Sequence, residues 1–95
     1  MWQYEVAKGR ETEFEQVYGA DGDWARLFAR SSGYLGTDLF RNLSVVRSYL
    51  TVDRFGDEDL WRQFLLDHAA AYAALDRRGD GLTVRELEIA ASVLP

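Results

Sequence analysis

The fold of this chain is decided by residues 34–55, which read YLGTDLFRNLSVVRSYLTVDRF. Residues 35–41 alternate between apolar and polar side chains, and residues 45–55 are rich in β-branched and aromatic side chains. Both patterns are typical of strands. A short turn at Leu43 and Ser44 separates the two segments, so the sequence predicts an antiparallel hairpin.

Both faces of the predicted hairpin carry large apolar side chains. Leu50 and Val52 belong to one face, and Tyr49 and Phe55 belong to the other. Helices of the same chain can cover one face, so the second face needs a cover from elsewhere. A second copy of the chain is the most economical cover. The sequence therefore predicts a homodimer through this sheet face.

Strands and helices flank the hairpin in a regular order. Residues 2–6 alternate with period two and predict a first strand. Helical spacing begins at Arg10, and Asp23 is placed to cap a second helical piece. After the hairpin, residues 57–75 show the clearest helix pattern, with Asp57 as its N-cap and acidic residues in the first turn.

The last segment, residues 82–94, returns to strand composition, but its alternation changes phase part-way. A β-bulge near Arg85 and Glu86 would account for the change. The order is therefore β-α-β-β-α-β, which indicates an α+β fold of the ferredoxin-like sandwich type. The length of 95 residues is that of a single domain.

Composition excludes several classes of partner and site. The net charge is −5 and no basic cluster is present, so neither nucleic acid nor an anionic membrane is an expected partner. The absence of Cys and the presence of one His exclude thiolate and His-rich metal sites. Asp21 and Asp23 are interpreted as a turn and a cap, not a calcium site. No signal-peptide pattern or long apolar run is found, so a cytoplasmic location is expected.

Three motifs carry a resemblance to one family: YGADGDWARLF at 18–28, GYLGT at 33–37 and YLTVDRF at 49–55. Together they resemble the antibiotic biosynthesis monooxygenase family of dimeric α+β barrels, over nearly the whole chain. The resemblance implies that residues 1–95 form one such domain, that two copies close a barrel, and that each protomer holds a pocket between sheet and helices. Members of that family include oxygenases that use no metal or flavin on phenolic or quinol substrates.

The chain departs from the family pattern at three positions. Phe55 stands where the family often has a Trp at the end of the third strand. The haem-degrading branch uses an Asn on the first strand and a Trp on the last helix, where this chain has Trp2 and Phe64. Haem degradation is therefore not expected.

The long predicted helix places Trp61, Phe64, His68, Tyr72 and Leu75 at spacings of three and four, so they share an inward stripe. A neutral imidazole can take a phenolic proton near neutral pH, which makes His68 a candidate catalytic base. Tyr72 can hydrogen-bond the same substrate oxygen. The alternative interpretation is structural, with His68 bonded to a strand carbonyl and Tyr72 in the core.

Asp53 and Arg54 are neighbours on a predicted strand, so their side chains point to opposite faces. If Asp53 lies on the pocket face, it can orient His68 or a substrate hydroxyl, and it is the third candidate catalytic residue. The alternative is an ion pair with Arg41 or Arg47.

Further aromatic residues are candidates for a flat slot that binds a planar ligand, or for the core alone. The candidate substrate-binding residues are Trp61, Phe64, Trp24, Phe28, Tyr34 and Phe55, and Trp2 and Tyr4 are interpreted chiefly as core.

Three functions remain open at this point. The leading hypothesis is a monooxygenase without cofactor or metal that acts on a planar aromatic metabolite. The second is a dimer of the same fold that binds a small molecule or serves a structural role without catalysis. The third is an isomerase or lyase that uses His68 as a proton shuttle without oxygen.

Overall fold

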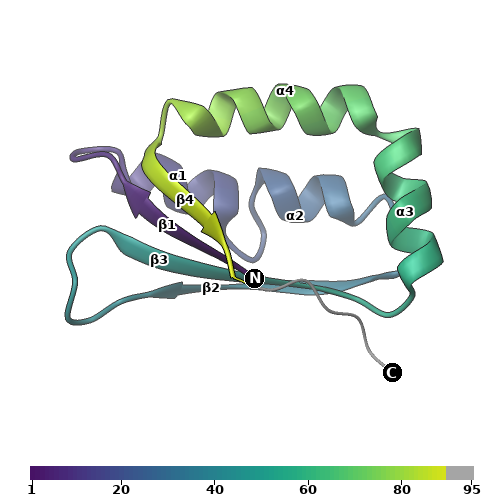
Figure 1. Cartoon of the computed structure of the whole chain (residues 1–95), viewed down its shortest axis with the longest axis horizontal. Coiled ribbons are helices and arrows are strands. Elements are labelled where there is room, and N and C mark those ends of the chain that lie inside the picture. Colours follow the sequence, from purple (N-terminus) through teal and green to yellow (C-terminus); the bar gives the residue numbers. More distant parts are fainter. Residues whose placement is uncertain (90–95) are drawn as a thin grey trace.

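The computed structural model describes residues 1–89 and shows a sheet with helices packed on one face (Figure 1). The strands lie in the order β2-β3-β1-β4, and each pair is antiparallel. The predicted α+β, ferredoxin-like fold class is confirmed. Along the chain the elements are β1 (Trp2–Val6), α1 (Glu11–Tyr18), α2 (Asp23–Phe28), β2 (Tyr34–Arg41), β3 (Ser48–Phe55), α3 (Glu58–Asp67), α4 (Ala69–Asp80) and β4 (Thr83–Glu88).

The hairpin of β2 and β3 forms as predicted, but β3 begins at Ser48 and not at Val45. The connection is therefore longer than the predicted turn. The Asn42 side chain accepts hydrogen bonds from the backbone N–H groups of Ser44 and Val45, at 2.8 and 3.1 Å. Arg47 has a φ of 60°, which no extended strand allows. These local bonds replace strand pairing over the first residues of the predicted strand.

The register of the hairpin confirms that both of its faces are apolar. Tyr49 and Phe55 face the helices and are buried, whereas Leu50 and Val52 lie on the open face and are partly exposed. Arg54 shares the open face and pairs with Asp38 of β2 at 2.5 Å.

A bulge in β2 changes which residues share a face. Tyr34 pairs with Phe55 and Gly36 pairs with Arg54, so Leu35 is an extra residue. Gly36 has a φ of 136°, which favours glycine at this position. As a result Tyr34 and Thr37, an odd number of residues apart, both face the helices.

The two helical pieces predicted before β2 are confirmed as α1 and α2. The prediction that Asp23 caps the second piece is wrong, because Gly22 is the N-cap residue and Asp23 is the first helical residue. Asp57 does cap α3, as predicted: its side chain accepts from the backbone N–H groups of Asp59 and Leu60, at 2.7 and 3.1 Å.

The prediction of one helix over residues 57–75 is wrong. His68 has a φ of −121° and divides the segment into α3 and α4, and α4 continues to Asp80. The two helices run in different directions, with α3 at one end of the sheet and α4 above α1 and α2 (Figure 1). The turn lets Phe64 of α3 pack against Phe55 of β3 and Tyr72 of α4 pack against Trp24 of α2.

The predicted bulge in the last strand is confirmed and lies at Val84. Glu5 pairs with Arg85 and Val6 pairs with Thr83, so Val84 has no opposite residue on β1. The strand ends at Glu88. The remainder of the predicted strand, residues 90–94, lies outside the described residues.

Among the helices of residues 1–89, none has both the length and the apolar character that crossing a membrane requires.

Candidate functional site

A partly open cavity of about 150 Å³ lies between the sheet and the helices. Thr51 of β3 is buried at its base, and Asp76 of α4 and Glu86 of β4 are exposed at its mouth. The cavity is lined by Trp2, Tyr4, Tyr18, Trp24, Phe28, Thr51, Asp53, Tyr72, Asp76 and Glu86.

Four of the nine candidate site residues line this cavity: Trp24 and Phe28 of α2, Asp53 of β3 and Tyr72 of α4. The rings of Trp24 and Tyr72 meet edge to face at 4.8 Å. These residues come from three elements, and only the tertiary fold brings them together.

The other five candidates lie beside the cavity and not in its lining. Four of them form what we call the packed cluster: Tyr34, Phe55, Trp61 and Phe64. The ring centroids of Phe55 and Trp61 are 4.8 Å apart, and those of Trp61 and Phe64 are 5.7 Å apart. His68 is half-buried, with its ring 5.1 Å from that of Phe64. Phe28 contacts the packed cluster and also lines the cavity, so it separates the two regions.

Six lining residues were not among the sequence-based candidates. Trp2 and Tyr4 were interpreted chiefly as core, although their alternation on β1 places both on the helix-covered face. Asp76 follows Tyr72 by one helical turn, a spacing that could have indicated it. Glu86 lies opposite Tyr4 only because of the β4 bulge, and this register is not readable from local sequence. Tyr18 and Thr51 complete the set.

Asp53 is held by a hydrogen-bonded chain. Thr37 Oγ1 donates to Asp53 Oδ1 at 2.5 Å, and the Tyr34 hydroxyl lies 2.5 Å from Thr37 Oγ1. Because the Thr37 hydrogen is directed to the carboxylate, Tyr34 is the donor in the second bond. Among the described residues no arginine forms an ion pair with Asp53, so the alternative of a pair with Arg41 or Arg47 is not observed.

Burial raises the pKa of Asp53 above its ordinary value, and the hydrogen bond from Thr37 opposes this effect. Burial also raises the pKa of Tyr18 to about 12 and raises the pKa values of Tyr4 and Tyr72. The tyrosine hydroxyls in the cavity therefore stay protonated at neutral pH and can donate hydrogen bonds.

Two buried polar atoms in the lining have no hydrogen-bond partner among the described residues. They are Trp24 Nε1 and Thr51 Oγ1, on side chains of residues that are 7% and 2% exposed. The Tyr18 hydroxyl lies close enough to Trp24, and the Tyr4 hydroxyl close enough to Thr51, to lower the tyrosine pKa values as a hydrogen bond does, but neither contact has the full geometry of a hydrogen bond. Burying such an atom without a partner is costly, so a hydrogen-bonding atom of a ligand in the cavity would stabilise each of them.

An acidic group stands at the mouth of the cavity. Carboxylate oxygens of Asp76, Asp80 and Glu86 lie within 4.8 Å of one another, and all three residues are exposed. Burial raises the pKa of Glu86, and the charges of Asp76 and Asp80 raise it further.

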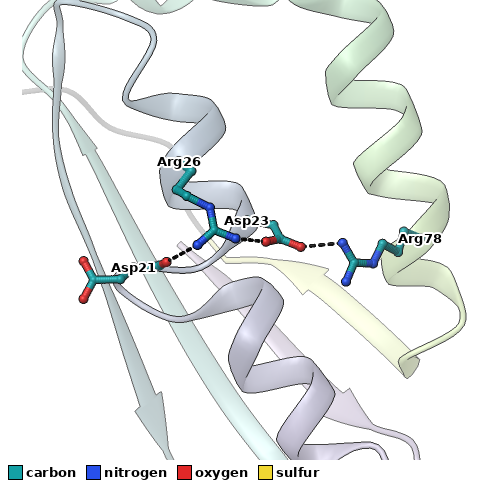
Figure 2. A network of polar contacts seen from close by, with 4 residues as sticks. All are labelled: Asp21, Asp23, Arg26 and Arg78. Atoms are coloured by element: carbon teal, nitrogen blue, oxygen red, sulfur yellow. Dashed lines mark hydrogen bonds and ion pairs between the residues drawn. The ribbon is translucent and has the colours of Figure 1, made fainter.

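A polar network joins α4 to α2 (Figure 2). Arg26 donates to the backbone carbonyl of Asp21 at 3.0 Å and to one carboxylate oxygen of Asp23. Arg78 of α4 donates to the other oxygen of Asp23. Both oxygens of Asp23 are thus engaged by guanidinium groups, and the helix that carries Trp24 is tied to the helix that carries Tyr72.

No family model matches the chain, and no curated protein matches it. Among solved structures, the chain is similar to SnoaB, a cofactor-independent oxygenase from Streptomyces nogalater. The TM-score is 0.59 and the sequence identity is 27%, over 99% of this chain and 92% of that chain. The fold is that of the antibiotic biosynthesis monooxygenase type. The resemblance inferred from the sequence motifs is thereby confirmed.

Within this fold, the cavity combines groups that can bind a phenol and accept its proton. Asp53 is a half-buried carboxylate held in place by Thr37, and the Trp24 indole N–H is buried without a partner at full hydrogen-bond geometry. Aromatic walls can hold a planar ring between them. The site can therefore bind an aromatic hydroxyl, accept its proton and donate a hydrogen bond to its oxygen.

Proposed function

We propose that the protein is a cofactor-independent monooxygenase that acts on a small phenolic or quinol-type ring bound in the cavity. The reaction class rests on the likeness to SnoaB, a cofactor-independent oxygenase, over 99% of the chain. The cavity adds a carboxylate and an unpartnered donor at the place where a substrate hydroxyl would lie.

The volume of the cavity limits the substrate. At about 150 Å³ it is comparable to an apolar cavity of about 150 Å³ that holds one benzene molecule. A single aromatic ring fits within the walls, and substituents extend through the mouth between α4 and β4.

In the proposed mechanism Asp53 accepts a proton from the substrate. Its raised pKa makes it a stronger base than an exposed carboxylate, and Thr37 holds it in orientation. Trp24 Nε1 donates a hydrogen bond to the resulting phenolate oxygen. The electron-rich anion then gives electrons to dioxygen within apolar walls that limit water. For a hydroquinone, one oxygen atom becomes a ring hydroxyl and the other leaves as water while the ring is oxidised to the hydroxyquinone (C₆H₆O₂ + O₂ → C₆H₄O₃ + H₂O), so the substrate supplies all four electrons.

His68 is the second candidate for the proton acceptor. It is half-buried and contacts Phe64, which in turn contacts Phe28 on the cavity wall. Asp53 is the preferred base in our proposal because it lines the cavity, whereas His68 is separated from it by the ring of Phe64.

The test is oxygen uptake with a panel of hydroquinones and single-ring phenols. We expect Asp53→Asn to lower kcat by about 10²–10⁴-fold, the usual loss when a general base is removed. The control variant Asp59→Asn changes a carboxylate whose side chain is 93% exposed on α3, and it should leave the rate unchanged.

His68→Ala separates the two candidate bases in the same assay. A large loss in His68→Ala with an unchanged rate in Asp53→Asn would transfer the role to His68. Absence of uptake with every compound, despite binding, would leave a non-catalytic binding protein. Turnover under anaerobic conditions would instead indicate an isomerase or lyase.

We also propose that two copies of the chain pair through the open sheet face. Leu35, Phe40 and Leu87 on this face are 55%, 52% and 56% exposed, next to Leu50 and Val52. Contiguous apolar surface of this kind marks an interface. Light scattering at micromolar concentration should show a dimer.

A charge on the open face should convert the dimer to a monomer, and Phe40→Lys is the chosen variant. Leu66→Lys is the matched control, because Leu66 is 76% exposed on α3, away from that face. A monomeric wild-type chain would contradict the proposed pairing.

A further inference from the structure

We infer that the cavity selects an aromatic ligand that carries both a hydroxyl and a protonated amine, with the hydroxyl inside and the amine at the mouth. This inference names the substrate class of the proposed oxygenase and rests on that function only in using the same cavity. Binding measurements test it without turnover.

The composition of the walls favours an organic cation. Six of the ten described lining residues are aromatic and three are carboxylates, and none of the ten is Lys or Arg. Ring faces attract an ammonium group, and aromatic walls with nearby carboxylates are the usual surroundings of bound amines. The basic residue of α4 that lies nearby, Arg78, is engaged with Asp23 of α2.

The charges at the mouth of the cavity also favour a cation. Asp76, Asp80 and Glu86 bring their carboxylate oxygens within 4.8 Å of one another without a counter-charge from the lining. An ammonium group placed there relieves their mutual repulsion, whereas a carboxylate or phosphate on the ligand adds to it. Arg54 and the amino group of Met1 act on Asp53 from outside the lining, and neither is among the charges that shift the pKa of Glu86.

The interior supplies the second, independent observation. Trp24 Nε1 and Thr51 Oγ1 are buried in the lining without partners, so the inner end of the cavity is suited to an oxygen atom of a ligand. An indole N–H can only donate, so the group it meets must be an acceptor, such as a phenol oxygen. The two ends of the cavity therefore suit different ligand groups: an oxygen atom at the inner end and a cation at the mouth.

This arrangement also resolves an electrostatic conflict in the proposed reaction. A phenolate formed beside the newly protonated Asp53 would still meet the negative charges of Asp76 and Glu86. A protonated amine on the same molecule pairs with the mouth carboxylates, and the indole N–H remains available to the phenolate oxygen.

The test compares three single-ring phenols of matched size and different charge: tyramine, 4-ethylphenol and 4-hydroxyphenylpropionate. Their binding to the full chain is followed by tryptophan fluorescence or calorimetry at neutral pH and low salt. We expect tyramine to bind about tenfold or more tighter than 4-ethylphenol, and the anion to bind most weakly. The preference should fall as salt is added, because Asp76 and Glu86 are exposed.

Glu86→Gln and Asp76→Asn should each reduce the ratio of tyramine to 4-ethylphenol affinity several-fold. Both residues are exposed, so the variants should fold normally. Asp59→Asn on α3 is the matched control and should keep the ratio of the wild-type chain.

Equal affinities for the three phenols, or a preference for the anion, would overturn the inference. So would a cation preference that both variants retain in full. These results are independent of the oxygenase assay: quinol oxidation without charge preference removes only this inference, and amine-selective binding without oxygen uptake removes only the proposed activity.

Discussion

Two aromatic regions lie side by side beneath the helices, and they differ in how completely they are filled. In the packed cluster beneath α3 the rings contact one another directly. Phe64 is 2% exposed, and the ring centroids of Phe55 and Trp61 are 4.8 Å apart. The cavity beneath α4 has equally aromatic walls but retains about 150 Å³ and two unpartnered polar atoms. The difference teaches that aromatic content does not separate core from site. Buried polar atoms and carboxylates do.

The largest expected effect distinguishes the packed cluster from the cavity. Phe64→Ala removes a fully buried ring and should lower the free energy of unfolding by about 3–5 kcal/mol. Tyr72→Phe in the cavity wall keeps the ring and should change it by less than about 1 kcal/mol. Denaturant unfolding measures both. A loss below that of Tyr72→Phe would show that the cluster is not tightly packed.

A smaller effect is expected where α4 meets the cavity. A Cβ added to Gly79 would lie 2.1 Å from the Tyr18 hydroxyl, so Gly79→Ala forces the lining ring to move. We expect a loss of about 1–3 kcal/mol in the free energy of unfolding, together with weaker binding of 4-ethylphenol. In Gly81→Ala the nearest atom is 3.7 Å away, in ordinary contact, and stability should be maintained. Equal losses in both variants would contradict this explanation.

Thr51→Val should act in opposite directions on stability and binding. Its hydroxyl is buried without a partner, so its removal should raise the free energy of unfolding by about 1 kcal/mol and weaken phenol binding. Thr37→Val removes a hydroxyl that donates to Asp53 and should instead lower stability by about 1–3 kcal/mol. Unfolding curves of the two variants give the comparison. A destabilised Thr51→Val would mean that its hydroxyl is satisfied in the free protein.

The smallest effect is expected in the pH dependence of stability. Burial raises the pKa of Asp53 from its ordinary value of 3.8, so the folded state holds this proton more tightly than the unfolded state. The stability from this group is complete below the ordinary value and is lost as pH rises through the raised pKa. Asp53→Asn should therefore gain stability relative to wild type between about pH 4 and about pH 7.

Unfolding of both proteins at the two pH values checks this expectation. Glu86, whose pKa is also raised, contributes the same slope in both proteins and cancels in the difference. A difference that shrinks toward neutral pH would contradict the assigned direction.

Much of the fold was predictable because it depends on neighbours in the chain. The strand over Trp2–Val6, the cap at Asp57 and the two apolar faces of β3 follow from alternation and local hydrogen bonding. The bulge in β4 was also visible, since the apolar phase changes within the strand. Each of these features is decided within a few residues.

The candidate site was predictable only in part. Asp53, Tyr72, Trp24 and Phe28 line the cavity, whereas Trp61 and Phe64 lie in the packed cluster. Nothing in the local sequence distinguishes the aromatic residues that line the cavity from those of the packed cluster. Their division depends on the break at His68, which no Gly or Pro announces, and which directs α3 and α4 to different parts of the sheet.

The sequence by itself determined the order of elements, the apolar phase of each strand and the excess of carboxylates over basic groups, because these are properties of composition and short-range spacing. The tertiary structure alone decided which aromatic rings pack together in the core and which line the cavity. The bulge at Leu35 places Tyr34 and Thr37 on the same face as Asp53, and strand register brings Glu86 opposite Tyr4. Such contacts depend on register and packed volume over long distances in the chain, which no local pattern encodes.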